Sequence, residues 1–177
     1  MISATCQRLE SATLKFLLNE STESLAGHVF DLLGAVPNVE VINTGFFATV
    51  GGFEFALNFH AGGAEDTVKL PAVVVSCVTG SEDERGIPNY QCDLEVRLEY
   101  HWKSDSTTPD VLKAMEAASN WLGEQMGRSD LAACLARNEA PFHVFGVIDF
   151  SGDTAVEGTR RIHSYRATVL ATPYNIV

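Results

Sequence analysis

The residues that first suggest chemistry form a row of charged side chains in the segment YQCDLEVRLEYHW, residues 90–102. Apolar and polar residues alternate there, so a β-strand would place one kind on each face. Four charged residues then share a face, namely Asp93, Glu95, Arg97 and Glu99. Such a face is either an ordinary solvated sheet surface or one that meets another subunit or lines a passage. Mixed signs around Arg97 would allow ion pairs between subunits, and the acidic excess would repel polyanions.

Motifs of the common catalytic and nucleotide-binding sites are missing from the sequence, including G-x-S-x-G, G-x-G-x-x-G, H-E-x-x-H and a phosphate-binding loop. The five histidines are scattered. His143, His163 and Asp149 could approach one another if the last two strands pair, and three such ligands could hold a metal. The acidic run at residues 82–84 lacks the alternating spacing of a calcium loop. We therefore predict no catalytic residues, no metal site and no cofactor.

Four cysteines are widely spaced, without a C-x-x-C pair or the histidine spacing of a zinc site. They are Cys6, Cys77, Cys92 and Cys134. Cys77 lies in the apolar run VVVSCV, and Cys92 falls in the apolar phase of the alternating segment. The pattern predicts buried, free thiols in a reducing compartment. A secreted protein with two disulfides is the alternative.

Composition describes an acidic globular chain. Its 177 residues suit one domain, and 46% hydrophobic with 20% charged residues argues against disorder. A net charge of −11 argues against tight binding to nucleic acid or anionic membranes, because both need clustered cations. No apolar run approaches the roughly 18 residues of a membrane-spanning helix, and the first residues lack the order of a signal peptide. These features predict a soluble cytoplasmic protein.

Hydrophobic periodicity gives the order of the elements. Helical spacing covers about residues 9–33, with a break at 19–22. From Val39 the period changes to two, and the Gly51-Gly52 pair between two apolar runs predicts a β-hairpin. We interpret residues 39–67 as an inserted hairpin arm.

The rest of the chain continues as strand, strand, helix pair and strand pair. KLPAVVVSCVTG predicts a buried strand before the alternating one, and helices are expected from Pro109 and after Ser129. FHVFGVIDF and RRIHSYRATVLATPY, joined by SGDTAVEG, predict an antiparallel hairpin. Together these elements predict an α+β fold for a single domain of residues 1–177. It would have an antiparallel sheet of at least four strands with helices packed on one face, plus the extra β-hairpin arm.

This order of elements resembles the tail terminator (tail-completion) proteins of long-tailed bacteriophages. The features that carry the resemblance are the N-terminal helix, the LPAVVVS strand, the strand YQCDLEVRLEYHW, the T-P-D helix, the short helix DLAACLARN and the hairpin FGVIDFSGD to RRIHSYRATVLATP. They cover about residues 1–35 and 69–174 as a pattern of elements.

The resemblance implies a non-enzymatic structural virion protein that forms a homohexameric ring. The ring would stack on the last ring of the tail tube, end its polymerisation and join tail to head. Its partners would be other copies of the chain, the major tail tube protein and the head connector protein, with DNA as a passing cargo that does not stick. The protein would be made in the host cytoplasm and end up in the virion, at the head–tail junction.

Two sets of residues are candidates for contacts in such a ring. The charged face around Arg97 would turn to the lumen or to a neighbouring subunit. The arm, at Gly51, Gly52 and Phe53, would touch an adjacent ring, since an exposed hairpin favours edge-to-edge pairing.

Two other functions fit the sequence. One is another head–tail connector or tail-tube ring protein of similar topology. The other is a small cytoplasmic α+β enzyme or ligand-binding domain with its cleft between sheet and helices. The native mass separates a stable ring from a monomer with a pocket.

Overall fold

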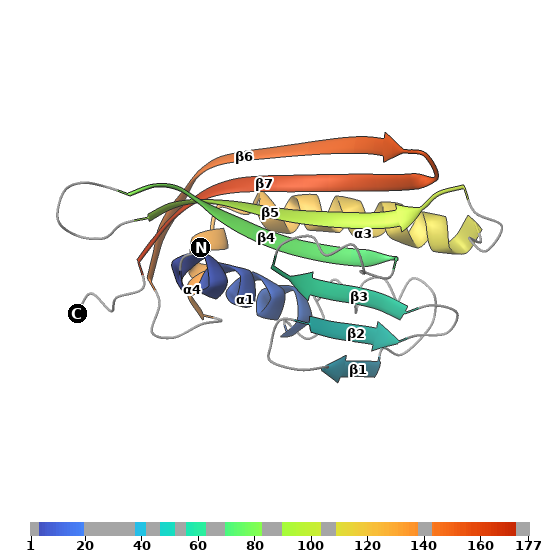
Figure 1. The fold of residues 1–177 in the computed structure, drawn as a ribbon, viewed down its shortest axis with the longest axis horizontal. Coiled ribbons are helices and arrows are strands. Elements are labelled where there is room, and N and C mark those ends of the chain that lie inside the picture. The colour runs from blue at the N-terminus through green and yellow to red at the C-terminus, as the bar shows by residue number, and fades with distance from the viewer. Residues whose placement is uncertain are drawn as a thin grey trace.

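The computed structural model describes residues 4–19, 38–41, 47–51, 56–62, 70–82, 90–103, 109–137 and 143–172. Within these ranges seven strands form one sheet in the order β1-β2-β3-β4-β5-β7-β6, and three helices pack against it (Figure 1). The helices are α1 (Ala4–Asn19), α3 (Pro109–Met126) and α4 (Leu131–Arg137). The strands are β1 (Asn38–Val41), β2 (Phe47–Gly51), β3 (Ala56–Ala61), β4 (Ala72–Glu82), β5 (Tyr90–His101), β6 (His143–Glu157) and β7 (Arg160–Thr172). The predicted α+β fold is confirmed.

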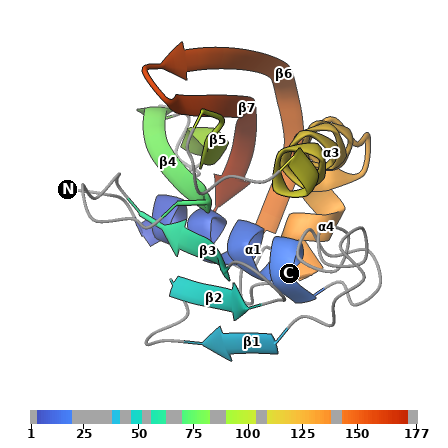
Figure 2. The same cartoon turned by 90° about the vertical axis from the view of Figure 1, so that its right-hand side faces the viewer.

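One face of the sheet carries the hydrophobic core. The residues of β5 on this face are buried, namely Cys92, Leu94, Val96, Leu98 and Tyr100. They belong to one cluster with apolar residues of α1, α3 and α4. Figure 2 shows the sheet curving around these helices, with β6 and β7 at the top and β1 to β3 at the bottom. The helices therefore pack on one face, as the alternation in β5 predicts.

Helices α3 and α4 begin where the sequence predicts them, and α1 begins at Ala4, before the predicted helical spacing from Leu9. Apolar residues of α1 at helical spacing, Leu9, Phe16 and Leu17, all lie in the core. Pro109 is the first residue of α3, a position where a backbone N–H would have no hydrogen-bond partner within the helix. The second predicted helical segment, about residues 21–33, lies outside the described residues.

The predicted hairpin consists of β2 and β3, which pair antiparallel with Phe47 opposite His60 and Gly51 opposite Ala56. Gly51 ends β2, and Gly52 and Phe53 lie outside the described residues. β3 also pairs with β4, in parallel, and Phe59 on β3 is completely buried in the core. The hairpin, with β1 added beside β2, therefore continues the main sheet along the edge of β4.

The predicted antiparallel pair at the end of the chain consists of β6 and β7. The turn lies later than SGDTAVEG suggests, because β6 runs on to Glu157 and the chain reverses at Gly158 and Thr159. Gly158 has a φ of 61°, which glycine adopts at little cost. Residues 151–160 are all exposed, so their polar composition reflects exposure of both strand faces to solvent.

Tyr165 on β7 fixes α3 to the sheet. Its hydroxyl donates a hydrogen bond to the carbonyl oxygen of Ser119 at 2.6 Å and lies 2.7 Å from the Ser119 hydroxyl. A Cβ on Gly123, one turn along α3, would lie only 3.0 Å from the Tyr165 ring. Any larger residue at position 123 would therefore require the Tyr165 ring to shift by a few tenths of an ångström.

We expect Tyr165→Phe to lower the free energy of unfolding by about 1 kcal/mol, because the ring packing stays while the hydrogen bonds are lost. Urea denaturation followed by circular dichroism would measure it. A double-mutant cycle with Ser119→Ala should show coupling between the two residues. Purely additive effects would mean that the two hydroxyls do not cooperate in holding α3.

Candidate functional site

The charged row on β5 lies on the sheet face opposite the helices. Asp93, Glu95, Arg97 and Glu99 alternate with the buried core residues of the same strand. In the antiparallel register with β7, Asp93 lies opposite Thr168 and Glu95 opposite Arg166. The four predicted residues therefore share one face, and the neighbouring strands extend this face on both sides.

Five side chains of alternating charge form a chain of ion pairs on this face. Arg166 lies 3.2 Å from Glu95, Arg97 lies 3.7 Å from both Glu95 and Glu99, and Arg160 lies 3.6 Å from Glu99. Each carboxylate thus has two cations beside it. This row of ion pairs runs along β5 and crosses to β7 at both ends.

The middle of this row of ion pairs is its least exposed part. The side chain of Glu99 is 10% exposed and that of Arg97 is 24% exposed. Exposed ion pairs contribute little to stability, about 0–1 kcal/mol each. Removing Arg97 would instead take one of its two cations from each of Glu95 and Glu99, and Glu99 has little access to solvent. Arg97 therefore links Glu95 and Glu99, and Glu99 is the least exposed side chain of the row.

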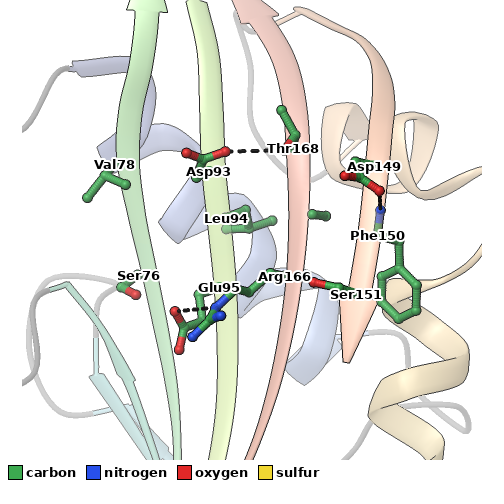
Figure 3. A pocket seen from close by; sticks show the side chains of 11 residues that line it. Ser76, Val78, Asp93, Leu94, Glu95, Asp149, Phe150, Ser151, Arg166 and Thr168 are labelled. Atoms are coloured by element: carbon green, nitrogen blue, oxygen red, sulfur yellow. Dashed lines mark hydrogen bonds and ion pairs between the residues drawn. The ribbon is translucent and has the colours of Figure 1, made fainter. Parts of the chain in front are cut away.

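A groove crosses the four strands β4, β5, β7 and β6 on this face (Figure 3). Its volume is about 420 Å³. It is lined by Ser76, Val78, Asp93, Leu94, Glu95, Asp149, Phe150, Ser151, Arg166, Ala167 and Thr168.

Two exposed acids and two exposed apolar residues characterise this groove. Asp93 on β5 accepts a hydrogen bond from Thr168 at 3.2 Å, and Asp149 on β6 accepts one from the backbone N–H of Phe150 at 2.8 Å. Val78 on β4 is 63% exposed, and Phe150 on β6 is 41% exposed. The groove therefore combines negative charge with exposed apolar side chains.

Sequence reasoning found the β5 part of this face and missed the part on β6 and β7. Arg160, Arg166 and Thr168 recur at even spacing along β7, so their alternation was visible in the sequence. The register that places Arg166 beside Glu95 was not visible, since it depends on how the two strands pair.

The histidines and acids considered as metal ligands do not converge. His143 lies opposite Thr172, Asp149 opposite Thr168 and His163 opposite Thr154, so the three are spread along the β6–β7 pair. His163 lies instead in a buried network, with Nε2 3.0 Å from the Tyr100 hydroxyl and Nδ1 2.9 Å from the Thr154 hydroxyl. Burial lowers the pKa of His163 below its usual range, helped by the nearby Arg161 cation, so the ring is neutral at pH 7.

A second cluster of chemical interest lies between α1 and the sheet. All four cysteines are free and buried, as predicted, so the alternative with two disulfides is wrong. The sulfur atoms of Cys6, Cys77 and Cys92 all lie within 4.8 Å of one another. This convergence was missed, because the sequence indicates the burial of each cysteine and not the position of α1 over β4 and β5.

Glu10 borders the three cysteines. It lies one helical turn after Cys6, is 2% exposed, and accepts a hydrogen bond from the backbone N–H of Cys77 at 2.9 Å. That amide lies just beyond Val75, the last residue of β4 that pairs with β3. Burial raises the pKa of Glu10 to about 7, although the bond from Cys77 opposes the shift. Hydrogen bonding to Cys6 and burial likewise raise the pKa of the Cys77 and Cys92 thiols.

Neither the family models nor the curated proteins contain a match to this chain. The described helices include none that is long and apolar enough to cross a membrane. The functional proposal therefore depends on the fold and on the charged face of the sheet.

Proposed function

We propose that this chain is a structural virion protein that assembles into a ring, caps the tail tube, ends its polymerisation and joins the tail to the head. The ring would be a homohexamer in contact with the major tail tube protein and the head connector protein. The observation that carries the proposal is the charged sheet face of four long strands, which the described helices leave uncovered. Such a face suits a building block that works through its surfaces.

The charge of this face favours a passage for DNA. Asp93 and Asp149 are exposed, as are Asp153 and Glu157 further along β6, whereas most cations of the face are paired with acids. With a net charge of −11 per chain, a ring of several copies would repel phosphates. DNA could then slide through without the counterion release that makes binding tight.

The edges of the sheet favour self-assembly and stacking. β6 pairs with β7 on one side, and its other edge has no partner strand among the described residues. β1 is in the same position at the opposite edge. Free strand edges pair readily with strands of another chain. In this proposal β6 is a candidate for contact within the ring. The hairpin of β2 and β3, in which β2 ends at Gly51, is a candidate for contact with the next ring.

Native mass spectrometry and electron microscopy of the purified chain test the proposal. A ring of about six copies with a central hole, which binds the end of purified tail tubes and stops their growth, is the expected result. A chain that stays monomeric at high concentration and with tail tubes present would contradict it.

Single charge reversals test the role of the charged face. Asp93→Lys places a cation in the groove, whereas Glu124→Lys makes the same change at an exposed position on α3. We expect Asp93→Lys either to break the ring or to leave a ring that now retains DNA at low salt, because a lumen cation would attract phosphates. Glu124→Lys should do neither. Wild-type assembly and DNA retention in Asp93→Lys would exclude Asp93 from both lumen and interface.

A further inference from the structure

The three converging cysteines have no part in the proposed function. We propose that Cys6, Cys77 and Cys92 bind one thiophilic metal ion of the Zn²⁺ type between α1 and the sheet. The site would tie the N-terminal helix to the two central strands. The proposed metal site does not depend on the proposed role of the chain in a virion.

The distances suit three sulfur ligands around one ion. Zinc–sulfur bonds of about 2.3 Å in a tetrahedral site place the sulfur atoms about 3.8 Å apart. Cys6 and Cys92 already lie 3.9 Å apart, and all three sulfur atoms lie within 4.8 Å of one another. The Cys6–Cys92 separation is far longer than a disulfide bond of about 2.05 Å. These two sulfur atoms are therefore not joined in a disulfide, and changes of at most about 1 Å in the sulfur–sulfur distances would complete the geometry.

Three different elements hold these ligands in place. Cys77 on β4 lies opposite Leu94, and Cys92 on β5 lies opposite Thr79, so the two cysteines are diagonal neighbours on the core face of the sheet. Cys6 approaches them from α1, which packs against both strands. All three side chains are between 0% and 3% exposed. A site built from regular elements in the core needs little rearrangement to bind an ion.

The chemistry of the ligands selects a soft cation. Sulfur donors favour zinc and related ions over magnesium or calcium, which require oxygen. On binding, the three thiols release three protons to solvent, and the resulting thiolates with a divalent ion carry a net charge of −1. Glu10 borders the cluster and is bonded to the amide of Cys77, so it is the candidate for the fourth ligand of a four-coordinate ion.

Cys134 provides an internal comparison. It is also buried, but its sulfur contacts Arg137 and Asp130 of its own helical region and is not part of the cluster. A cysteine that serves only as a small apolar residue needs no second cysteine beside it. Three cysteines from distant parts of the sequence converge at one point, which is what a metal site requires.

Cobalt titration of the reduced, metal-free full chain tests the proposal, both on the folded protein and during refolding from urea. We expect one equivalent of Co²⁺ to bind with thiolate-to-metal charge-transfer absorption and the intense visible bands of a four-coordinate site. Zn²⁺ should displace it and raise the melting temperature. Cys6→Ala, Cys77→Ala and Cys92→Ala should each lose the charge-transfer band, and Cys134→Ala should keep it.

Alkylation of the wild-type chain gives a readout that does not depend on how well the variants fold. In mild denaturant, mass spectrometry should find all four cysteines modified in metal-free protein, and only Cys134 modified rapidly after Zn²⁺ is added. The proposal is overturned if reduced protein takes up no Co²⁺ with a thiolate band under either condition. Equal protection of Cys134 and the other three would overturn it as well.

Discussion

Phe59→Ala is expected to lower the free energy of unfolding by about 3–5 kcal/mol, the usual cost of removing a buried phenylalanine. Phe59 is completely buried on β3, opposite Val73 of β4, and α1 packs against the same strand. Alanine would leave a cavity between the sheet and the helix that neither element could close. Since a domain of this size is stable by only about 5–15 kcal/mol, the loss is a large fraction of the total.

Urea denaturation at fixed temperature measures this effect. Val78→Ala is the control, because Val78 lies on the neighbouring strand and is 63% exposed. It should change the free energy of unfolding by less than about 0.5 kcal/mol. If Phe59→Ala costs as little as Val78→Ala, the hairpin is an independent appendage and not part of the core.

The hairpin illustrates which features of the fold the sequence predicts. The change of period at Val39 and the glycine pair at Gly51 indicate β2 and β3, because both signals are local. The parallel pairing of β3 with β4 cannot be predicted in this way, since it joins two segments that are not adjacent in the sequence and has no local signature. Sequence patterning therefore predicts the strands correctly and leaves their attachment to the sheet undetermined.

The charged row on β5 could be predicted from the sequence, whereas the cysteine cluster could not. Asp93, Glu95, Arg97 and Glu99 lie on one strand, so strict alternation is sufficient to place them on one face. The cysteine cluster requires residue 6 to meet residues 77 and 92. That meeting depends on the docking of α1 against the sheet, which side-chain packing decides.

The two faces of the sheet thus carry different kinds of chemistry. The charged face, with its exposed Asp93 and Asp149, offers contacts to other molecules. The core face holds the cysteines with Glu10, where any bound ion would stabilise the chain from within. A defect in the core cluster should therefore change stability first, whereas a change at Asp93 should affect assembly and leave stability nearly unchanged.

Glu10 should make the reduced, metal-free protein lose stability as the pH rises. Its pKa is about 7 in the folded chain against an ordinary value of 4.5, so the folded state holds the proton more tightly than the unfolded state. The contribution of Glu10 to the free energy of unfolding is therefore greatest below pH 4.5. It falls as the pH rises from 4.5 to about 7. The difference between the two pKa values corresponds to a loss of about 3 kcal/mol.

Glu10→Gln tests this expectation, because its amide oxygen can still accept the hydrogen bond from Cys77 but carries no charge at any pH. Urea denaturation of both proteins with a chelator and a reductant, from pH 4.5 to pH 8, should give curves that diverge as the pH rises. The variant should become the more stable by up to about 3 kcal/mol, less any cost of burying the new amide N–H₂ group. Glu124→Gln makes the same change on the exposed side of α3 and should follow the wild type throughout. Parallel curves for wild type and Glu10→Gln would mean that Glu10 ionises in the folded chain as easily as in water, and that its burial between α1 and β4 carries no electrostatic cost.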